Sequence, residues 1–315
     1  MTLIDGHHTS PLPPSVATIG FFDGVHRGHR FLLEQVKEVA AKAGVCSSVI
    51  TFPTHPRQVL QADFVPQLLS TPQEKLLRLE ETGISHCILL PFTRELSLLS
   101  AREFMQLLRQ EYNIRALVIG YDHRFGHNRT ETFEDYQRYG SELDISIVQA
   151  HAYTQDHAQV SSSAIRGLLC QGNVSLANEF LGSPYSLTGT VTDGYKVGRK
   201  MGFPTANIAV NHPGKLIPCE GVYAVFAHVN GEKHLGMLNI GHRPTLNNGS
   251  NLSIEVHILD FSDNIYQQEV RIEFHCFIRP EMKFASVDEL VLQIQKDKEH
   301  IVLWSEKHSF TDDKA

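Results

Sequence analysis

The first 180 residues alternate short apolar runs with segments of helical periodicity. Such runs are typical of strands buried on both faces of a parallel sheet, and the periodic segments between them are typical of crossover helices. The apolar runs lie at residues 16–22, 45–52, 87–92, 116–120 and 145–150. Capping boxes mark two helix starts, at Thr71 with Glu74 and at Ser100 with Glu103. This part of the chain is therefore predicted to be an α/β layer.

A different pattern follows residues 172–185. Short runs of alternating or continuous apolar residues are separated by turn residues, and Asn230-Gly231 between two of them is a strong hairpin signal. These runs lie at residues 187–194, 221–229, 234–241, 253–261 and 269–278. Closely spaced strands of this kind predict a compact antiparallel barrel.

The barrel is predicted to be followed by an amphipathic helix, 286–301, whose capping box is Ser286 with Glu289. A chain of 315 residues exceeds the usual size of one hydrophobic core. The pattern changes near Gly182, so we expect two domains, 1–182 and 183–315.

Composition narrows the function classes. The formal charge of −7 argues against a nucleic-acid partner, because binding to a phosphate backbone needs an excess of Lys and Arg. The five cysteines are scattered and form no C-x-x-C pair, which argues against a disulfide framework and a zinc site. No basic leader and no long apolar stretch is visible, so a cytoplasmic protein without a membrane partner is expected. The sequence does not predict an oligomeric state.

The first candidate site lies where an apolar run gives way to a helical pattern. Asp23-Gly24 predicts a turn, and the helix begins near His26. Free amides at a helix N-terminus attract phosphate, and His26 and His29, three residues apart, share a face of its first turn. Gly28 leaves room for a ligand to approach the backbone. A surface position or a metal site is also compatible with this pair, although no third metal ligand is in view.

The stretch GFFDGVHRGH, residues 20–29, resembles the H-x-G-H signature of the nucleotidyltransferase superfamily. Its flanks resemble the FAD synthetase half of bacterial bifunctional riboflavin kinase/FAD synthetases, with Phe21 in place of an Asn. The segment 120–130 resembles the G-x-D-F-x-F-G loop of that family, with His123 in place of a Phe and without a later glycine. The segment 160–166, VSSSAIR, resembles its I-S-S-T-x-I-R phosphate motif.

This resemblance implies a Rossmann-like α/β fold of the nucleotidyltransferase type and the transfer of AMP from ATP to FMN. The attacking phosphate is already an anion and needs no general base, so the site must stabilise charge on the phosphoryl oxygens. His26, His29 and Arg166 are the implied catalytic donors. The implied nucleotide contacts are Gly20, Phe22, Asp23, Gly24, Gly28, Asp122, Ser162 and Ser163.

The second candidate site lies in GTVTDGYKVGRKMGFPTANI, residues 189–208. This glycine-rich stretch has neither the P-loop spacing nor the dinucleotide-binding spacing. Pro204 fixes the local backbone, and Thr205 and Asn207, two residues apart in an extended segment, face the same side. Their oxygens suit Mg²⁺, a hard cation that prefers oxygen ligands and substrate phosphates.

The same stretch resembles the riboflavin kinase module, and the similarity continues through GVYAV, GMLNIGHRPT and IEVHILDF over roughly residues 184–305. The resemblance implies that Thr205 and Asn207 bind Mg²⁺ and that Glu255 is the catalytic base. A ribityl hydroxyl is neutral, so its phosphorylation calls for a carboxylate nearby. A glycine-rich arch would cover ATP, with contacts from Gly194, Gly198, Lys200 and Gly202.

The five motifs together predict a bifunctional enzyme that makes FMN from riboflavin and FAD from FMN, with ATP and Mg²⁺ in both steps. Its partners would be the small molecules riboflavin, FMN and ATP. Two alternatives stay open: a kinase with a weakened adenylyltransferase domain, and a flavin- or nucleotide-binding regulator without catalysis. The segment PTHP, residues 53–56, either contacts flavin or turns the chain.

Overall fold

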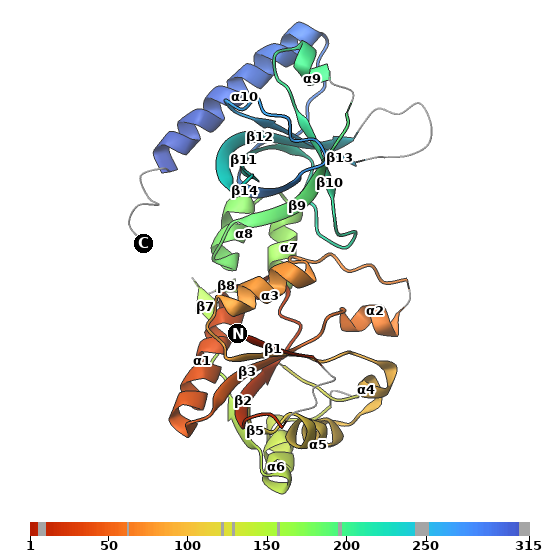
Figure 1. Ribbon diagram of the computed structural model, residues 1–315, viewed down its shortest axis with the longest axis vertical. Coiled ribbons are helices and arrows are strands. Elements are labelled where there is room, and N and C mark those ends of the chain that lie inside the picture. Colours follow the sequence, from red (N-terminus) through yellow and green to blue (C-terminus); the bar gives the residue numbers. More distant parts are fainter. Residues whose placement is uncertain are drawn as a thin grey trace. The chain divides into compact units, whose positions relative to one another are not determined.

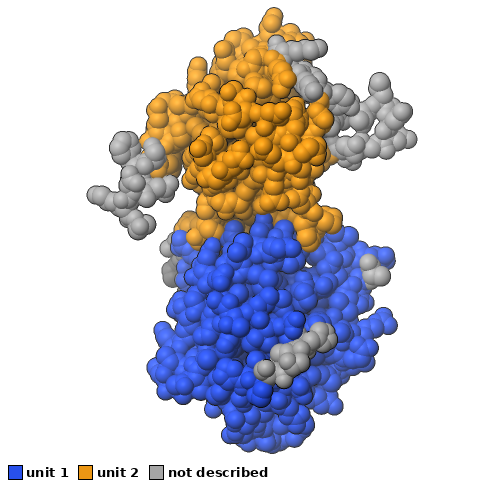
Figure 2. Space-filling view, viewed as in Figure 1, with its two compact units in different colours: residues 1–162 blue, residues 163–315 orange. Residues whose placement is uncertain are grey.

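We describe a computed structural model of the chain (Figure 1). The described residues are 1–5, 11–61, 63–120, 123–127, 130–155, 158–194, 197–242 and 252–308. The chain divides into two compact units, residues 1–162 and 163–315 (Figure 2). Among the described helices, none combines the length and the apolar composition needed to cross a bilayer.

Unit 1 is built on a parallel sheet of six strands, in the order β1-β4-β3-β2-β5-β6, which confirms the predicted α/β layer. Its strands are β1 (Thr2–Asp5), β2 (Ser15–Ile19), β3 (Cys46–Thr51), β4 (His86–Leu89), β5 (Ile114–Ile119) and β6 (Ser146–Gln149). The edge strand β1 was not predicted, because only Ile4 of its four residues is buried. A short hairpin, β7 (Thr154–Gln155) and β8 (Ala158–Gln159), completes the strands of this unit.

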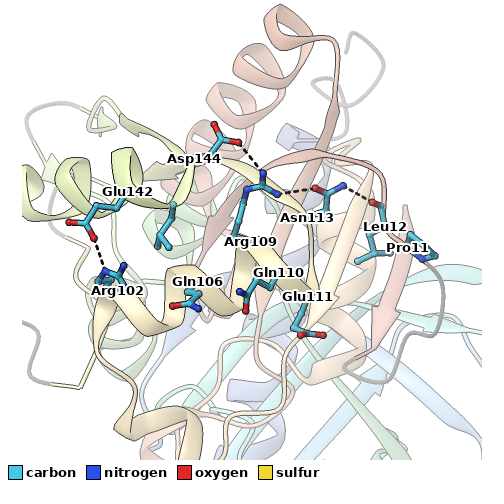
Figure 3. A pocket seen from close by; sticks show the side chains of 11 residues that line it. Pro11, Leu12, Arg102, Gln106, Arg109, Gln110, Glu111, Asn113, Glu142 and Asp144 are labelled. Carbon is cyan, nitrogen blue, oxygen red and sulfur yellow. Dashed lines mark hydrogen bonds and ion pairs between the residues drawn. The ribbon is translucent and has the colours of Figure 1, made fainter.

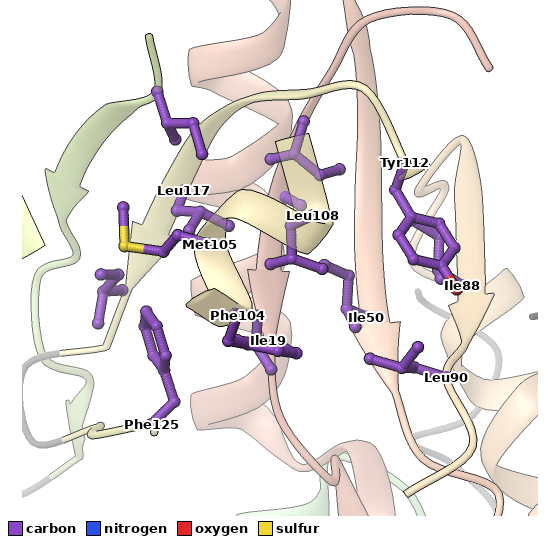
Figure 4. Close-up of a cluster of buried hydrophobic side chains, with 14 of the residues drawn as sticks. Ile19, Ile50, Ile88, Leu90, Phe104, Met105, Leu108, Tyr112, Leu117 and Phe125 are labelled. Carbon is purple, nitrogen blue, oxygen red and sulfur yellow. The ribbon is translucent and has the colours of Figure 1, made fainter. Parts of the chain in front are cut away.

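Helices cover both faces of this sheet (Figure 1). They are η1 (Asp23–Val25), α1 (Arg27–Ala43), α2 (Pro56–Leu60), α3 (Pro72–Glu80), α4 (Arg94–Leu98), α5 (Ala101–Glu111) and α6 (Phe133–Leu143). Side chains alternate across a strand, so Val49 joins the cluster under α1 while Ile50 joins the cluster under α5. Met105 and Leu108 of α5 fill the second cluster (Figure 4). The predicted capping boxes of α3 and α5 are confirmed.

Unit 2 contains a closed antiparallel barrel in the order β10-β13-β12-β11-β14-β9, as predicted. Its strands are β9 (Tyr185–Thr192), β10 (Ala206–Val210), β11 (Gly221–Val229), β12 (Glu232–His242), β13 (Leu252–Ile258) and β14 (Glu269–Arg279). Asn230 and Gly231 have φ angles of 52° and 87°, so the predicted hairpin turn between β11 and β12 is present. Tyr223, Leu238 and Phe274 are fully buried and fill the barrel.

Four helices belong to the sequence of this unit or begin at its boundary: α7 (Ser162–Cys170), α8 (Val174–Leu181), α9 (Val197–Lys200) and α10 (Val287–His308). The predicted C-terminal helix, α10, packs Ile301 against residues of the barrel wall. Helix α8 is tied to the barrel by Asn178, whose amide donates to the Phe274 carbonyl and accepts from the Tyr185 amide, each at 2.7 Å. The predicted domain boundary after residue 182 refers to the two modules recognised in the sequence, and it stays a prediction.

Candidate active sites

The turn after β2 has an unusual backbone. Phe22, Gly24 and Val25 have φ angles of 55°, 80° and 42°, all in the left-handed region. For a residue other than glycine this conformation costs about 1–2 kcal/mol, and it persists where the surrounding packing determines it. Phe22 is 2% exposed and Val25 is fully buried, so the core holds both side chains. The predicted strand 16–22 therefore stops at Ile19.

The turn leads directly into α1, and His26 is the N-cap of that helix. The Nδ1 atom of His26 accepts a hydrogen bond of 3.3 Å from the backbone amide of His29. An accepting Nδ1 places the proton of neutral His26 on Nε2, which leaves Nε2–H as a donor. The two imidazole rings are stacked, with 3.6 Å between centroids and 16° between planes. The structure thus brings the predicted pair together.

His29 has an environment that disfavours a positive charge. Burial, followed by the charges of His26 and Lys75, lowers its pKa well below the usual value for histidine. Its ring also meets the Phe22 ring edge-on, with 5.0 Å between centroids. Among the described residues, Nδ1 of His29 has no hydrogen-bond partner although it is buried. A buried polar atom left without a partner is costly, and a bound ligand relieves that cost.

Asp23 and Gly24 anchor the turn to the start of α3. The Asp23 carboxylate accepts from the backbone amides of Leu69, at 2.9 Å, and Ser70, at 3.0 Å. The Gly24 amide donates to the Ser70 hydroxyl at 2.9 Å. These are bonds within the protein, and the carboxylate carries the wrong charge for a phosphate group. The geometry gives both residues a positioning role beside the predicted contact with nucleotide.

Gly20 and Gly28 are required for close packing around the two histidines. A methyl group added at Gly20 would lie 3.0 Å from the Phe22 ring. One added at Gly28 would lie 3.3 Å from the His26 ring and 3.3 Å from the Val160 carbonyl oxygen. Real side chains rarely approach so closely, so a larger residue at either position would displace a ring of the site.

The structure describes three of the four remaining predicted residues of this site. Ser162, the first residue of α7, donates from its hydroxyl to the Asp23 carbonyl at 3.0 Å, which places it at the turn. Ser163 and Arg166 follow it on α7 and belong to unit 2. Asp122 lies outside the described residues.

Lys75 of α3 is a residue that the sequence did not point to. Its side chain is 3% exposed, and its Nζ donates to the Phe52 carbonyl at 2.8 Å and to the Phe21 carbonyl at 3.2 Å. Burial lowers its pKa to about 8, against the opposing effect of Asp23. A signal was available, because Lys75 stands four residues before Leu79, on the apolar face of its helix.

The same contacts bear on Phe21 and on the segment PTHP. The Lys75 ammonium lies 4.2 Å from the centroid of the Phe21 ring, a cation–π contact. Phe21 also meets the ring of His55 edge-on, with 4.7 Å between centroids. His55 caps α2 by accepting from the Arg57 amide at 3.1 Å. The segment thus leads the chain into α2 beside Phe21, and a contact with flavin stays a prediction.

In unit 2, the barrel register brings the three predicted kinase residues together. Asn207 of β10 pairs with Glu255 of β13, so their side chains leave the same face of the sheet. The hydroxyl of Thr205, just before β10, donates to Glu255 Oε2 at 3.1 Å. A hydroxyl, an amide and a carboxylate thus gather at one place and supply the hard oxygen donors that suit Mg²⁺.

The glycines of the predicted arch have different reasons to be glycine. A methyl group at Gly194 would lie 2.1 Å from Nδ2 of Asn207, and one at Gly198 would lie 2.4 Å from the Phe203 carbonyl oxygen. Gly202 has a φ of 85° in open space, so the backbone itself requires it. Lys200 is the last residue of the short helix α9 between them.

A cavity of about 290 Å³ opens beside Thr205. Pro204 and Arg199 stand at its wall with Thr205. The rest of the lining combines the apolar residues Val191, Ala206, Val256, Ile258, Phe261, Ile265 and Tyr266 with the polar residues Ser262, Asp263 and Asn264. A mainly apolar lining with some polar groups is typical of sites for small molecules.

A larger cavity of about 650 Å³ lies in unit 1, between α5, α6 and residues 11–12 (Figure 3). Four of its charged groups form ion pairs: Arg102 with Glu142 at 2.7 Å, and Arg109 with Asp144 at 3.0 Å. None of the predicted site residues lines it. The network joins the ends of two helices, so we assign it a structural role.

Comparisons with known proteins agree on both halves of the chain. A family model described as FAD synthetase matches residues 8–164, and one described as riboflavin kinase matches residues 181–304. A bifunctional riboflavin kinase/FMN adenylyltransferase from Listeria monocytogenes is 38% identical over 90% of each chain. The protein of the same name from Escherichia coli is 37% identical over 95% of this chain and 96% of its own.

A solved structure is similar over nearly the whole chain. It is a crystal structure from Streptococcus pneumoniae described as a macrolide-efflux protein, with a TM-score of 0.86 and 30% sequence identity. The similarity covers 95% of this chain and 98% of that one. The α/β unit and the barrel therefore occur together in another solved protein.

Proposed function

Because the chain belongs to the bifunctional riboflavin kinase/FMN adenylyltransferase family, we propose how its residues divide the two reactions between two sites. The enzyme phosphorylates riboflavin to FMN and adenylylates FMN to FAD. The observation that carries the division is the pairing of His26 with His29 in unit 1 and of Thr205 with Glu255 in unit 2.

In the adenylyl transfer, a phosphate oxygen of FMN forms a bond to the α-phosphorus of ATP as the bond to the pyrophosphate oxygen breaks. The nucleophile is an anion, so no proton has to be removed. Nε2–H of His26 and the neutral imidazole of His29 donate to the phosphoryl oxygens, together with the first amides of α1. These donors are held in place before the reaction, and so they stabilise the developing charge without reorganising.

The other residues of this site support or extend that arrangement. Gly20, Phe22, Asp23, Gly24 and Gly28 shape the turn, as their packing and hydrogen bonds indicate. We propose that the nucleotide also meets the following residues: Asp122, Ser162, Ser163 and Arg166. The guanidinium of Arg166 would bind the phosphate groups, for which its charge and planar donors are suited.

In the kinase reaction, Glu255 accepts the proton of the ribityl 5′-hydroxyl as its oxygen forms a bond to the γ-phosphorus of ATP and ADP leaves. Thr205 and Asn207 present their oxygens to Mg²⁺. When bound, Mg²⁺ neutralises charge on the phosphates. The Thr205 hydroxyl donates a hydrogen bond to Glu255, and this bond holds the carboxylate beside the oxygens of Thr205 and Asn207.

The nucleotide of the kinase site is proposed to lie in the cavity beside Thr205, with its base between the apolar walls. The phosphates would then reach the arch that contains Gly194, Gly198, Lys200 and Gly202. The absence of a side chain at Gly194 is what allows this loop to approach Asn207.

We propose that the partners are the small molecules riboflavin, FMN and ATP, with Mg²⁺ as the cation, and that neither nucleic acid nor a membrane takes part. A cytoplasmic location fits the supply of ATP.

The deciding experiment is chromatographic analysis of products from purified protein with riboflavin, ATP and Mg²⁺. We expect FMN to appear first and FAD to follow, and EDTA to stop both until Mg²⁺ is restored. FMN without FAD would favour a kinase with a weakened adenylyltransferase domain. No turnover of either flavin would favour a binding regulator.

A further inference from the structure

Lys75 is a buried lysine with every ammonium proton engaged. Besides the Phe21 and Phe52 carbonyls, its Nζ donates to the Thr51 hydroxyl at 3.2 Å. Three donors therefore meet three acceptors, and none is left for a ligand. The acceptors lie at or just after the carboxyl ends of β2 and β3, the edge of the sheet where ligands of open parallel sheets bind.

The left-handed residue Phe22 is held from both sides, by α3 and by the segment that precedes it. On one side, Lys75 binds the carbonyl and the ring of Phe21. On the other side, the amides at Leu69 and Ser70 bind the Asp23 carboxylate. The sterically unfavourable φ of Phe22 is thus determined by contacts on each neighbour.

The conformation of Phe22 bears directly on the histidine pair. Its ring packs edge-on against His29, and the His29 ring stacks on His26. A change at Phe21 that releases the turn would therefore move the Phe22 ring, and with it the two imidazoles. The path from the Lys75 ammonium to His29 passes through two adjacent residues.

We propose that Lys75 is a positioning residue for the adenylyl transfer: by holding Phe21 it sets the turn at Phe22 and so the placement of His29. The inference rests on the proposed role of His29 in that reaction. A fully hydrogen-bonded ammonium takes no part in the chemistry itself, so its effect is exerted through the turn and through its charge.

The charge of Lys75 affects the titration of His29, so the relationship between the two residues can be followed by spectroscopy. Together with burial and with His26, it lowers the pKa of His29. The groups that oppose the charge of Lys75 are Asp23 and Cys87. Removing the ammonium would therefore raise the pKa of His29, while a change at a lysine that is not among these causes, such as Lys37, would leave it in place.

The test compares Lys75→Met with Lys37→Met in the full chain. Lys37 is a matched control, since its Nζ also donates to a backbone carbonyl in unit 1, that of Thr82 at 2.6 Å. We expect Lys75→Met to lower kcat for FAD formation from FMN and ATP by about tenfold or more. FMN formation from riboflavin by the same samples reports that unit 2 is folded and is expected to stay unchanged, and the dispersed NMR signals of the unit 1 histidines report the folding of unit 1. Lys37→Met is expected to leave both rates unchanged.

The His29 imidazole is followed by NMR of the histidine-labelled protein across the pH range. In Lys75→Met its signal is expected to shift and its titration midpoint to rise, and in Lys37→Met neither changes. If the variant only lowered the amount of folded protein, the FAD rate would fall but the His29 signal of the folded protein would not move. An unchanged FAD rate or an unmoved His29 signal in folded Lys75→Met would overturn the inference.

Phe21→Leu is the second variant, because it removes the ring under the ammonium and keeps the backbone carbonyl. We expect it to lower the FAD rate, and the double variant to lose no more than Lys75→Met alone, since both act through one contact. If the fold-losses of the two single variants multiplied in the double variant, the two effects would be independent and the inference would be contradicted. If Lys75→Met also lowers FMN formation, the test is made with Phe21→Leu. An unmoved His29 signal in folded Phe21→Leu would then contradict the proposal.

His29→Ala separates this inference from the proposed function. If that variant forms FAD at the rate of the unchanged protein, the proposed adenylyl-transfer site is wrong. If it loses FAD formation while Lys75→Met keeps it, only the inference about Lys75 is wrong.

Discussion

The Thr205 hydroxyl donates a hydrogen bond of 3.1 Å to Oε2 of Glu255, across 50 positions of sequence. The contact exists because β10 and β13 pair in the register that sets Asn207 opposite Glu255. One residue proposed to hold Mg²⁺ therefore also orients the proposed base. This arrangement would place the proposed acceptor of the substrate proton beside the proposed Mg²⁺ site.

Glu255→Gln is expected to remove proton acceptance while keeping the shape of the side chain. The rate of FMN formation from riboflavin should fall by about 10²- to 10⁴-fold, which is the usual contribution of a general base. FAD formation from added FMN should be unchanged, because the other site needs no base. Glu232→Gln, at a side chain that is 79% exposed, is the control for both rates. A kinase that keeps its rate without Glu255 would require another base.

His29→Ala is expected to act in the opposite sense. FAD formation should fall by about 10²-fold or more, the usual loss on removing one donor to a developing negative charge. FMN formation should be unaffected, and His151→Ala at an exposed position of unit 1 should leave both reactions intact. If His29→Ala in a folded protein abolished both steps, the division into two sites would be wrong. Separate assays with riboflavin and with FMN measure the two steps.

Gly194→Ala should weaken the kinase site without removing any of its chemical groups. The added methyl would meet Nδ2 of Asn207 at 2.1 Å, so either the loop or the amide must move. We expect KM for MgATP in FMN formation to rise by about tenfold or more, because a small displacement of a binding group is costly. Gly167→Ala is the control, since a methyl there meets nothing within 4 Å. Titration of ATP at saturating riboflavin measures the effect.

Glu273 predicts how the barrel responds to acid. Burial by itself would raise its pKa, but the neighbouring His275 and His228 side chains, with His228 Nε2 at 3.0 Å from Oε2, and the charge of Arg271 lower it from 4.5 to about 2. A carboxyl whose pKa is lower in the folded state stabilises the fold above its unfolded pKa, and the contribution is lost as pH falls toward the folded pKa. Between pH 4.5 and 2 this loss is on the order of 3 kcal/mol.

Urea unfolding of the protein and of Glu273→Gln at pH 6 and pH 3 tests this expectation. The single tryptophan, Trp304, lies 5.6 Å from the His275 ring and reports on unit 2. The unchanged protein should lose more stability on acidification than Glu273→Gln, whose amide does not titrate. Equal losses would mean that the Glu273 cluster does not contribute to acid stability.

Much of the fold could be predicted because its signals are local. Apolar periodicity indicated the strand and helix order, and the hydroxyl at Thr71 followed by Glu74 marked a helix start that the structure confirms. The edge strand β1 was missed, since a short strand with one buried residue has no distinct pattern. Residues 16–22 were predicted as one strand, but the left-handed conformation of Phe22 ends it early.

In the sites too, local features could be predicted from the sequence and long-range contacts could not. Short motifs placed His26 beside His29 and Thr205 beside Asn207, because neighbours on one turn or one strand face the same way whatever the rest of the chain does. The sequence assigned Asp23 to the nucleotide, and the structure adds bonds to amides 46 and 47 positions away. Lys75 had only the appearance of a helical lysine until its partner Phe21, 54 positions away, was known.

The resemblance of its motifs indicated the family and the two reactions. The sequence by itself also determined the local geometry of each motif, because periodicity, capping and glycine spacing act over a few residues. Only the tertiary structure decided that Glu255 meets Thr205 and that Lys75 holds Phe21. Such contacts depend on strand register and on how a helix packs at the sheet edge. Many distant residues together settle that packing, and no short stretch of the chain records it.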